Sequence, residues 1–118
     1  SERQSVSREW RLHWRDVIEC RRKIERYAAG MGLDAFKADE RTYDAVVRNV
    51  ELIGEAVKAL PEDARALAPR IEWRKIAGMR DFVTHVYFSI NDVILWDVVT
   101  KKVPELLAVM ERCRRVEG

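Results

Sequence analysis

The chain has 118 residues, of which 47% are apolar and 36% are charged, a composition that suits one domain with a modest core and excludes extensive disorder. Lysine and arginine total 22 against 20 aspartates and glutamates, so the net charge of +2 does not by itself indicate nucleic-acid binding, which would need a local basic patch. With only 5 glycines and 3 prolines there is little turn chemistry for a many-stranded fold, and the composition favours helices.

The first predicted helix covers residues 8–29, with Ser7 as its N-cap and the glycines at 30 and 32 as its stop. Its apolar residues fall on one side at helical spacing, and five arginines fall roughly on the opposite side, with Glu19 among them. Arg21 is the exception, because it projects from the apolar side; it either extends its head group to solvent or faces an acidic partner. The apolar residues are Trp10, Trp14, Val17, Ile18, Ile24 and Ala28, and the arginines are Arg8, Arg11, Arg15, Arg22 and Arg26.

The second long helix is predicted over residues 41–60, after a connector at 31–40 that holds about one turn of helix at 34–37. Gly54 lies on the buried stripe of this helix, where a better helix former would be favoured by roughly 1 kcal/mol, so another helix is expected to approach closely there. Pro61 ends the helix. The stripe consists of Tyr43, Val46, Val47, Val50, Ile53, Val57 and Leu60.

The rest of the chain is predicted to form a helical turn at 63–67, a third helix at 73–86, and two further helical segments. Ser89 and Asp92 fit a capping box for the next helix, and Pro104 either kinks that helix or begins a new segment, before an amphipathic run over 106–116. The predicted fold is therefore all-α: an antiparallel bundle of about four main helices plus short helical segments, in a single domain spanning 1–118. The helix after the capping box carries Val93, Ile94, Trp96, Val98 and Val99.

The two cysteines, Cys20 and Cys113, form no CxxC pair and have no histidine cluster near them, so neither a metal site nor a disulfide framework is expected. No stretch reaches the roughly 20 apolar residues of a membrane span, and the charged N-terminus lacks the apolar segment of a signal peptide. We therefore expect a cytoplasmic protein that needs no metal or other cofactor.

The segment from Arg80 to Tyr87 holds the residues best suited to catalysis. The imidazole of His85 can take the proton from an RNA 2′-hydroxyl, which then attacks the adjacent phosphorus, while the guanidinium of Arg80 holds the phosphate oxygens without a metal. Asp81 could fix the imidazole tautomer, and Thr84 shares the stripe of Arg80 and Tyr87, so both are candidate supporting residues. Arg80 and His85 lie about 140° apart on an ideal helix, which favours a site completed by a second copy of the chain.

Each of these residues also has a simpler interpretation. His85 would be a surface or structural histidine, and Tyr87 a half-buried aromatic with a solvated hydroxyl. The arginine stripe is either a solvated helix face or a track for an RNA backbone, with Arg11, Arg15 and Arg22 as possible contacts. His13 is expected to be structural. The four tryptophans are expected to be core or interface residues rather than a platform for stacked bases: Trp10, Trp14, Trp73 and Trp96.

Several segments resemble the HepT-like ribonucleases, a branch of the HEPN superfamily. Residues 42–56, TYDAVVRNVELIGEA, resemble the second-helix signature of the family, and residues 73–81, WRKIAGMRD, resemble the approach to its active site. The residues Arg80, His85 and Tyr87 match the family's R-x4-H-x-Y motif, and Trp96-Asp97 with the following Pro104 resembles its last conserved region. The resemblance covers about residues 16–107, and the segments are specific together because they occur in order and at these spacings.

The resemblance implies an all-helical homodimer and a metal-independent endoribonuclease, the toxin of a type VII-like toxin–antitoxin pair. It implies that Arg80 and His85 are catalytic and that two copies of them line a cleft between the subunits. The family's usual antitoxin is the minimal nucleotidyltransferase MntA, which silences the toxin by attaching AMP to the tyrosine that matches Tyr87. The added charge and bulk would exclude an RNA phosphate.

Asp81 departs from the family pattern, which usually has asparagine after the arginine. The wider superfamily accepts Asn, Asp or His there, so the site is expected to keep its function, although a carboxylate places negative charge beside the incoming phosphate and would slow cleavage. Arg21 also occupies a position that is usually apolar. Two alternatives from other classes stay open: a non-catalytic helical module that binds a nucleotidyltransferase or its nucleotide, and a purely structural dimeric bundle.

Overall fold

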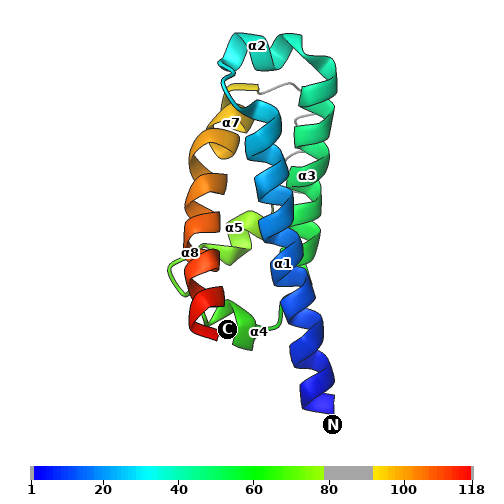
Figure 1. Ribbon diagram of the computed structural model, residues 1–118, viewed down its shortest axis with the longest axis vertical. Helices are drawn as coiled ribbons and strands as arrows, with labels where there is room; N and C mark the ends of the chain where they lie inside the picture. The colour runs from blue at the N-terminus through cyan, green and yellow to red at the C-terminus, as the bar shows by residue number, and fades with distance from the viewer. Residues whose placement is uncertain (1, 79–91, 118) are drawn as a thin grey trace.

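The computed structural model describes residues 2–78 and 92–117, and within them the side chains of residues 10–78, 92–105 and 108–112. Every element among these residues is helical, which confirms the predicted all-α class. The three long helices are α1 (Glu2–Ala28), α3 (Glu40–Lys58) and α8 (Val103–Glu117). They run side by side along the length of the bundle, and the N-terminal end of α1 extends beyond the other helices (Figure 1).

The helix α1 begins earlier than the sequence predicted and ends where it predicted. Because it starts at Glu2, Ser7 lies inside the helix, and its prediction as the N-cap is wrong. Residues 2–9 contain no glycine or proline, and an acidic residue at the N-terminal end is favoured by the helix dipole, so nothing in this stretch delays the helix. At the other end, Gly30 has a φ of +75°, a left-handed conformation that favours glycine and stops the helix.

One residue, Asp39, separates α2 (Leu33–Ala38) from α3 and caps both helices. Its backbone N–H donates to the carbonyl of Ala35, and its side chain accepts a hydrogen bond from the N–H of Thr42 at 3.1 Å. Because the bonds from Thr42 favour the ionised carboxylate, they lower the pKa of Asp39. The predicted helical turn at 34–37 and the helix at 41–60 are confirmed to within two residues at each end.

The indole of Trp73 connects the short helices α4 (Glu62–Arg65) and α5 (Trp73–Ala77). Its Nε1 lies 2.9 Å from the carbonyl oxygen of Arg65 and 3.1 Å from that of Ala68, so one N–H is shared between two acceptors. The Arg65 guanidinium donates in turn to the carbonyl of Val57, at 3.1 Å, near the end of α3. The third helix begins at Trp73 as predicted, but α5 ends at Ala77 with Gly78 as its C-cap, so the single helix predicted over 73–86 is wrong. Residues 79–86 and the predicted cap at Ser89 lie outside the described residues.

The C-terminal helical path consists of α7 (Asp92–Asp97), the π-helical turn η1 (Val98–Lys102) and α8. Pro104 lies in the first turn of α8, directly after the π-helical turn, and the helical path is continuous across it. Proline has no N–H to donate to the carbonyl four residues back, and its ring clashes with that carbonyl. The wider π-helical turn before Pro104 lets the helical path continue without this hydrogen bond. Of the apolar residues predicted here, Val99 is buried, whereas Val93 and Ile94 are 66% and 42% exposed.

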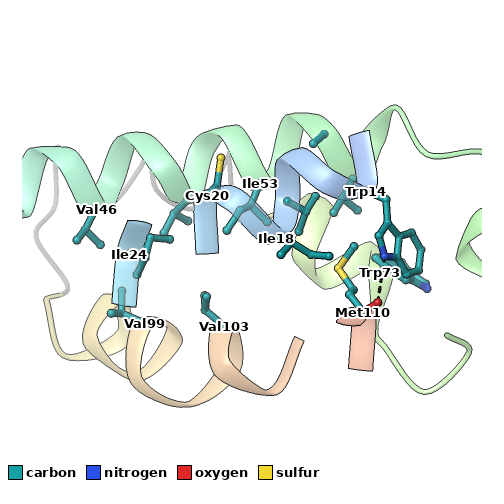
Figure 2. Packing of buried hydrophobic residues seen from close by; sticks show 14 of the residues in the cluster. Trp14, Ile18, Cys20, Ile24, Val46, Ile53, Trp73, Val99, Val103 and Met110 are labelled. Carbon is teal, nitrogen blue, oxygen red and sulfur yellow. Dashed lines mark hydrogen bonds between the residues drawn. The ribbon is translucent and has the colours of Figure 1, made fainter. Parts of the chain in front are cut away.

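The core lies where α1 packs against α3 on one side and against α8 on the other. Figure 2 shows Ile18 and Ile24 of α1 close to Ile53 of α3 and to Val99 and Val103 of the C-terminal path. Each fully buried aliphatic side chain contributes roughly 1.5–3 kcal/mol relative to an exposed one. These contacts join the first, second and last predicted helices into one core. Its largest fully buried members are Phe36, Ile18, Ile24, Ile53, Leu95 and Met110.

Arg21 lies inside this core with only 6% of the residue exposed. Its Nε donates to the carbonyl of Val103 at 3.2 Å, and its Nη1 forms an ion pair with Glu25 one turn later. Burial lowers the pKa of Arg21, while Glu25 and the more distant Glu111 oppose that shift. Of the two predicted alternatives, the acidic partner is therefore correct, and Arg21 joins α1 to the start of α8.

Candidate functional site

The residues predicted to perform the chemistry lie within 79–91, outside the described residues: Arg80, Asp81, Thr84, His85 and Tyr87. Their roles stay predictions. The structure describes the helix on either side of this segment in the chain, because α5 ends at Ala77 and α7 begins at Asp92. These two helices are the described attachment points of the predicted catalytic segment.

The attachment before the segment is α5, which is held to the core by aromatic contacts. Trp73 is 8% exposed, and its ring centroid lies 5.7 Å from that of Trp14. The Trp14 Nε1 donates to the carbonyl of Met110 in α8, at 3.2 Å (Figure 2). Since both indoles are buried and hydrogen-bonded, α5 is joined through them to α1 and α8.

The attachment after the segment is Asp92, the first residue of α7. Its Oδ1 accepts a hydrogen bond from the hydroxyl of Tyr43 in α3, at 2.7 Å. The ring of Phe36 lies 5.1 Å from the ring of Tyr43 and 4.8 Å from that of Trp96, so α2, α3 and α7 meet in one aromatic cluster. A hydrogen bond from a hydroxyl to a carboxylate is charge-assisted and therefore stronger than one between neutral groups. This bond joins the start of α7 to the start of α3.

The arginine stripe predicted on the first helix forms an exposed face of α1. At about 100° per residue, its four described members fall within an arc of about 60°. The Arg11 guanidinium lies 5.7 Å from the ring centroid of Trp10, and the Arg26 guanidinium lies 5.7 Å from that of Tyr27. This arginine face comprises Arg11, Arg15, Arg22 and Arg26, and includes the three predicted RNA-backbone contacts.

Arg22 of the arginine face pairs with a residue of another helix. Its Nη2 forms an ion pair with Oε1 of Glu111 in α8. The two side chains are 52% and 32% exposed, so solvent screens much of their attraction. Glu111 is 89 positions away in the chain, and no spacing rule could have identified it as the partner of Arg22.

His13, predicted to be structural, is partly buried at a groove between α1 and α3. The groove has a volume of about 400 Å³ and an apolar lining that includes Leu52, Ala56 and Cys20, with Asp16, Glu19, Lys23 and Glu55 around them. Burial raises the pKa of the Cys20 thiol, which disfavours the nucleophilic thiolate at neutral pH. The groove therefore offers no activated cysteine.

The tryptophans occupy the positions predicted for core or interface residues. Trp14 and Trp73 are buried, and Trp10 and Trp96 are partly buried against the core. The rings of Trp10 and Trp14 meet nearly edge to face, with centroids 5.7 Å apart. Since Trp14 and Trp73 are buried and Trp96 packs against Phe36, these rings are not arranged as an open platform for bases.

Within the described part of the chain, no three His, Cys, Asp or Glu side chains are grouped in a way that could hold a metal ion. No helix among those residues is long and apolar enough to cross a membrane.

The described helices define a small all-α protein with an arginine-rich face on α1. Comparison with known families identifies the family to which it belongs. The chain belongs to the ribonuclease HepT-like family, which matches residues 17–113. The match begins in α1, spans the predicted catalytic segment and extends into α8. The family resemblance predicted from the sequence is confirmed.

Relatives from archaea and bacteria match most of the chain. A protein of Methanocaldococcus jannaschii that is provisionally named as an RNase is 40% identical over 104 residues, which cover 87% of this chain and 86% of that protein. A protein of Thermococcus cleftensis, named as a probable ribonuclease HepT, is 37% identical over 100 residues, with 85% and 91% covered. A protein of Caldanaerobacter subterraneus, also provisionally named as an RNase, is 43% identical over 88 residues, with 75% and 78% covered. No solved structure matches the chain significantly.

Proposed function

We propose that this protein is a metal-independent endoribonuclease that acts in the cytoplasm as the toxin of a type VII-like toxin–antitoxin pair. In this proposal the chain is a single domain over 1–118 and forms a homodimer. The main support is the family match over residues 17–113, which contains the R-x4-H-x-Y motif at Arg80, His85 and Tyr87. Relatives that cover three quarters or more of the chain and carry RNase names support the same class of activity.

In the proposed reaction, the imidazole of His85 accepts the proton of an RNA 2′-hydroxyl, and the resulting oxygen attacks the adjacent phosphorus. The P–O5′ bond breaks, and the leaving oxygen takes a proton from the protonated imidazole of the second copy. Arg80 binds the phosphate oxygens through its guanidinium fork and stabilises the charge of the transition state. Asp81 and Thr84 support this pair, and a dimer supplies two copies of each residue.

The proposed regulator is an MntA-like nucleotidyltransferase antitoxin that modifies Tyr87. The tyrosine oxygen attacks the α-phosphorus of ATP, pyrophosphate leaves, and AMP stays on the ring. A phosphodiester beside Arg80 and His85 would repel an incoming RNA phosphate and occupy its space. Incubation with the cognate enzyme and ATP is expected to add the mass of AMP to the wild type, and equal labelling of Tyr87→Phe would move the modification elsewhere.

The nuclease proposal is tested with a labelled RNA in buffer that contains EDTA. Wild-type protein is expected to cut the RNA, and His85→Ala and Arg80→Ala are expected to lose about 100-fold or more of the rate. Arg70→Ala is the matched control, because Arg70 is an exposed arginine outside the motif and outside the segment that resembles the approach to the active site. Intact RNA at high wild-type concentration, or equal cutting by the His85 variant, would refute the proposal.

A second candidate function is a non-catalytic helical module that binds a nucleotidyltransferase or its nucleotide. The aspartate at position 81 favours this candidate, because a carboxylate beside the predicted catalytic arginine repels an RNA phosphate. Such a module would form a stable complex with the nucleotidyltransferase and leave RNA intact. Asp81→Asn separates the two candidates. The substitution should accelerate RNA cleavage if the protein is a slow nuclease, and RNA should stay intact if the protein is a non-catalytic module.

A further inference from the structure

The arginine face of α1 has a built-in competitor. We propose that Glu111 of α8 competes with nucleic-acid phosphate for Arg22, so that this face binds a phosphate backbone less tightly than its four arginines would allow. The inference rests on the proposed function only in taking RNA as the natural ligand of the face.

The length of the face suits a short run of phosphates. At about 1.5 Å of rise per residue, Arg11 and Arg26 are about 22 Å apart along α1, and neighbouring arginines are separated by about 6 to 10 Å. Phosphates of one strand follow each other at about 3.4 Å in a stacked helix and at longer intervals when the strand is extended, so the face covers about four to seven of them. Arg22 lies within this run and not at its end.

Glu111 presents to Arg22 the same type of acceptor that a phosphate presents. Both groups offer oxygens that take charge-assisted hydrogen bonds from a guanidinium fork. The ion pair is open to solvent, with its two side chains 52% and 32% exposed, so an approaching phosphate can replace the carboxylate. An exposed pair of this kind is weak, and its loss on binding lowers affinity by about two- to five-fold.

Glu111 can be changed without stranding a buried charge. Arg21, which lies next to Arg22 and also senses Glu111, keeps its ion pair with Glu25 and its hydrogen bond to the carbonyl of Val103. Glu111 itself is only partly buried, and it meets α1 at the ion pair with Arg22. The variant Glu111→Gln therefore removes the competing charge and leaves the core contacts in place.

The test measures binding of a fluorescein-labelled single-stranded DNA of about 12 nucleotides by fluorescence anisotropy. DNA lacks the 2′-hydroxyl, so it cannot be cut by the proposed mechanism. Glu111→Gln is expected to tighten binding by about two- to five-fold and to steepen the dependence of log Kd on log salt by up to about 0.7. Glu105→Gln is the matched control, because it removes the same charge from an exposed position on α8.

A double-mutant cycle distinguishes competition from a general change in charge. Arg22→Gln is expected to weaken binding by less than two-fold in the wild type and by about three- to five-fold in the Glu111→Gln background. Equal effects of Arg22→Gln in both backgrounds, equal tightening by Glu105→Gln, or no binding by any variant would overturn the inference. RNA cleavage is scored separately: coupled binding with intact RNA refutes only the nuclease, and cleavage without coupling refutes only the competition.

Discussion

Replacing Arg21 tests whether a buried charge or the packing of its side chain stabilises the junction of α1 with α8. Arg21→Ala removes a side chain that is 6% exposed, together with its hydrogen bond to the carbonyl of Val103. Arg21→Met removes the charge and keeps most of the volume. We expect the alanine variant to be clearly destabilised and the methionine variant to be close to wild type.

The magnitudes follow from what each variant leaves behind. The hydrogen bond is worth about 1 kcal/mol, and loss of the packed aliphatic part adds about 1–2 kcal/mol, which gives about 2–3 kcal/mol for Arg21→Ala. The Glu25 side chain is 45% exposed, so it stays solvated when its partner is lost and adds little to that cost. In Arg21→Met, no charge has to be removed from water on folding, and this gain offsets the lost polar contacts. The free energy of unfolding should therefore change by no more than about 1 kcal/mol.

Urea and thermal unfolding followed by circular dichroism measure both variants. For a chain of this length, about 1 kcal/mol corresponds to roughly 4 °C in Tm, so Arg21→Ala should lose about 8–12 °C and Arg21→Met at most about 4 °C. Arg15→Ala is the control, because Arg15 is an exposed arginine on the same helix, and its Tm should change little. A methionine variant as unstable as the alanine variant would refute the reasoning and show that the charge itself stabilises the junction.

Three other residues give separate predictions. Tyr43→Phe removes only the hydroxyl bound to Asp92 and should destabilise the protein by about 1 kcal/mol in urea unfolding, with Tyr27→Phe as an exposed control; no change would mean that the bond contributes nothing. Trp73→Phe deletes the shared indole N–H and should cost about 1–3 kcal/mol by the same measurement, and a neutral result would contradict the role of the indole in holding α4 to α5. The folded-state pKa of Asp39 lies below its ordinary 3.8, so its stabilising effect is present above that value and is lost as the pH falls through the folded pKa. Asp39→Asn keeps a capping acceptor but not the charge, so its Tm should lie below that of the wild type at neutral pH and converge with it as the pH falls below the folded pKa of Asp39; a constant difference would exclude the charge.

Periodicity predicted the long helices well, because apolar side chains at helical spacing need a buried partner wherever they pack. The helix at 41–60 and the stop at Gly30 were both found in the structure. Ser7 was misassigned because residues that cap helices also occur inside them, and no glycine or proline in residues 2–9 stops α1 before the predicted start. The exposure of Val93 and Ile94 could not be predicted, since a short apolar run does not show which of its sides meets the core.

The candidate functional site also has features that the sequence could predict and features that it could not. The exposed arginine face could be predicted, because its members share one side of a single helix and need no other element. The pairing of Arg22 with Glu111 could not, and neither could that of Tyr43 with Asp92, since each joins residues far apart in the chain. The predicted catalytic residues from Arg80 to Tyr87 rest on the motif and the family match.

The sequence by itself determined the all-α class, the main helix positions and the family, because these depend on local spacing and short motifs. Only the tertiary structure decided that Arg21 is a buried link to Val103, that a π-helical turn precedes Pro104, and that Glu111 faces Arg22. The physical reason is the same in each case. A hydrogen bond or ion pair across helices depends on which sides of the two helices meet, and that is settled by the packing of the whole core rather than by either helix alone.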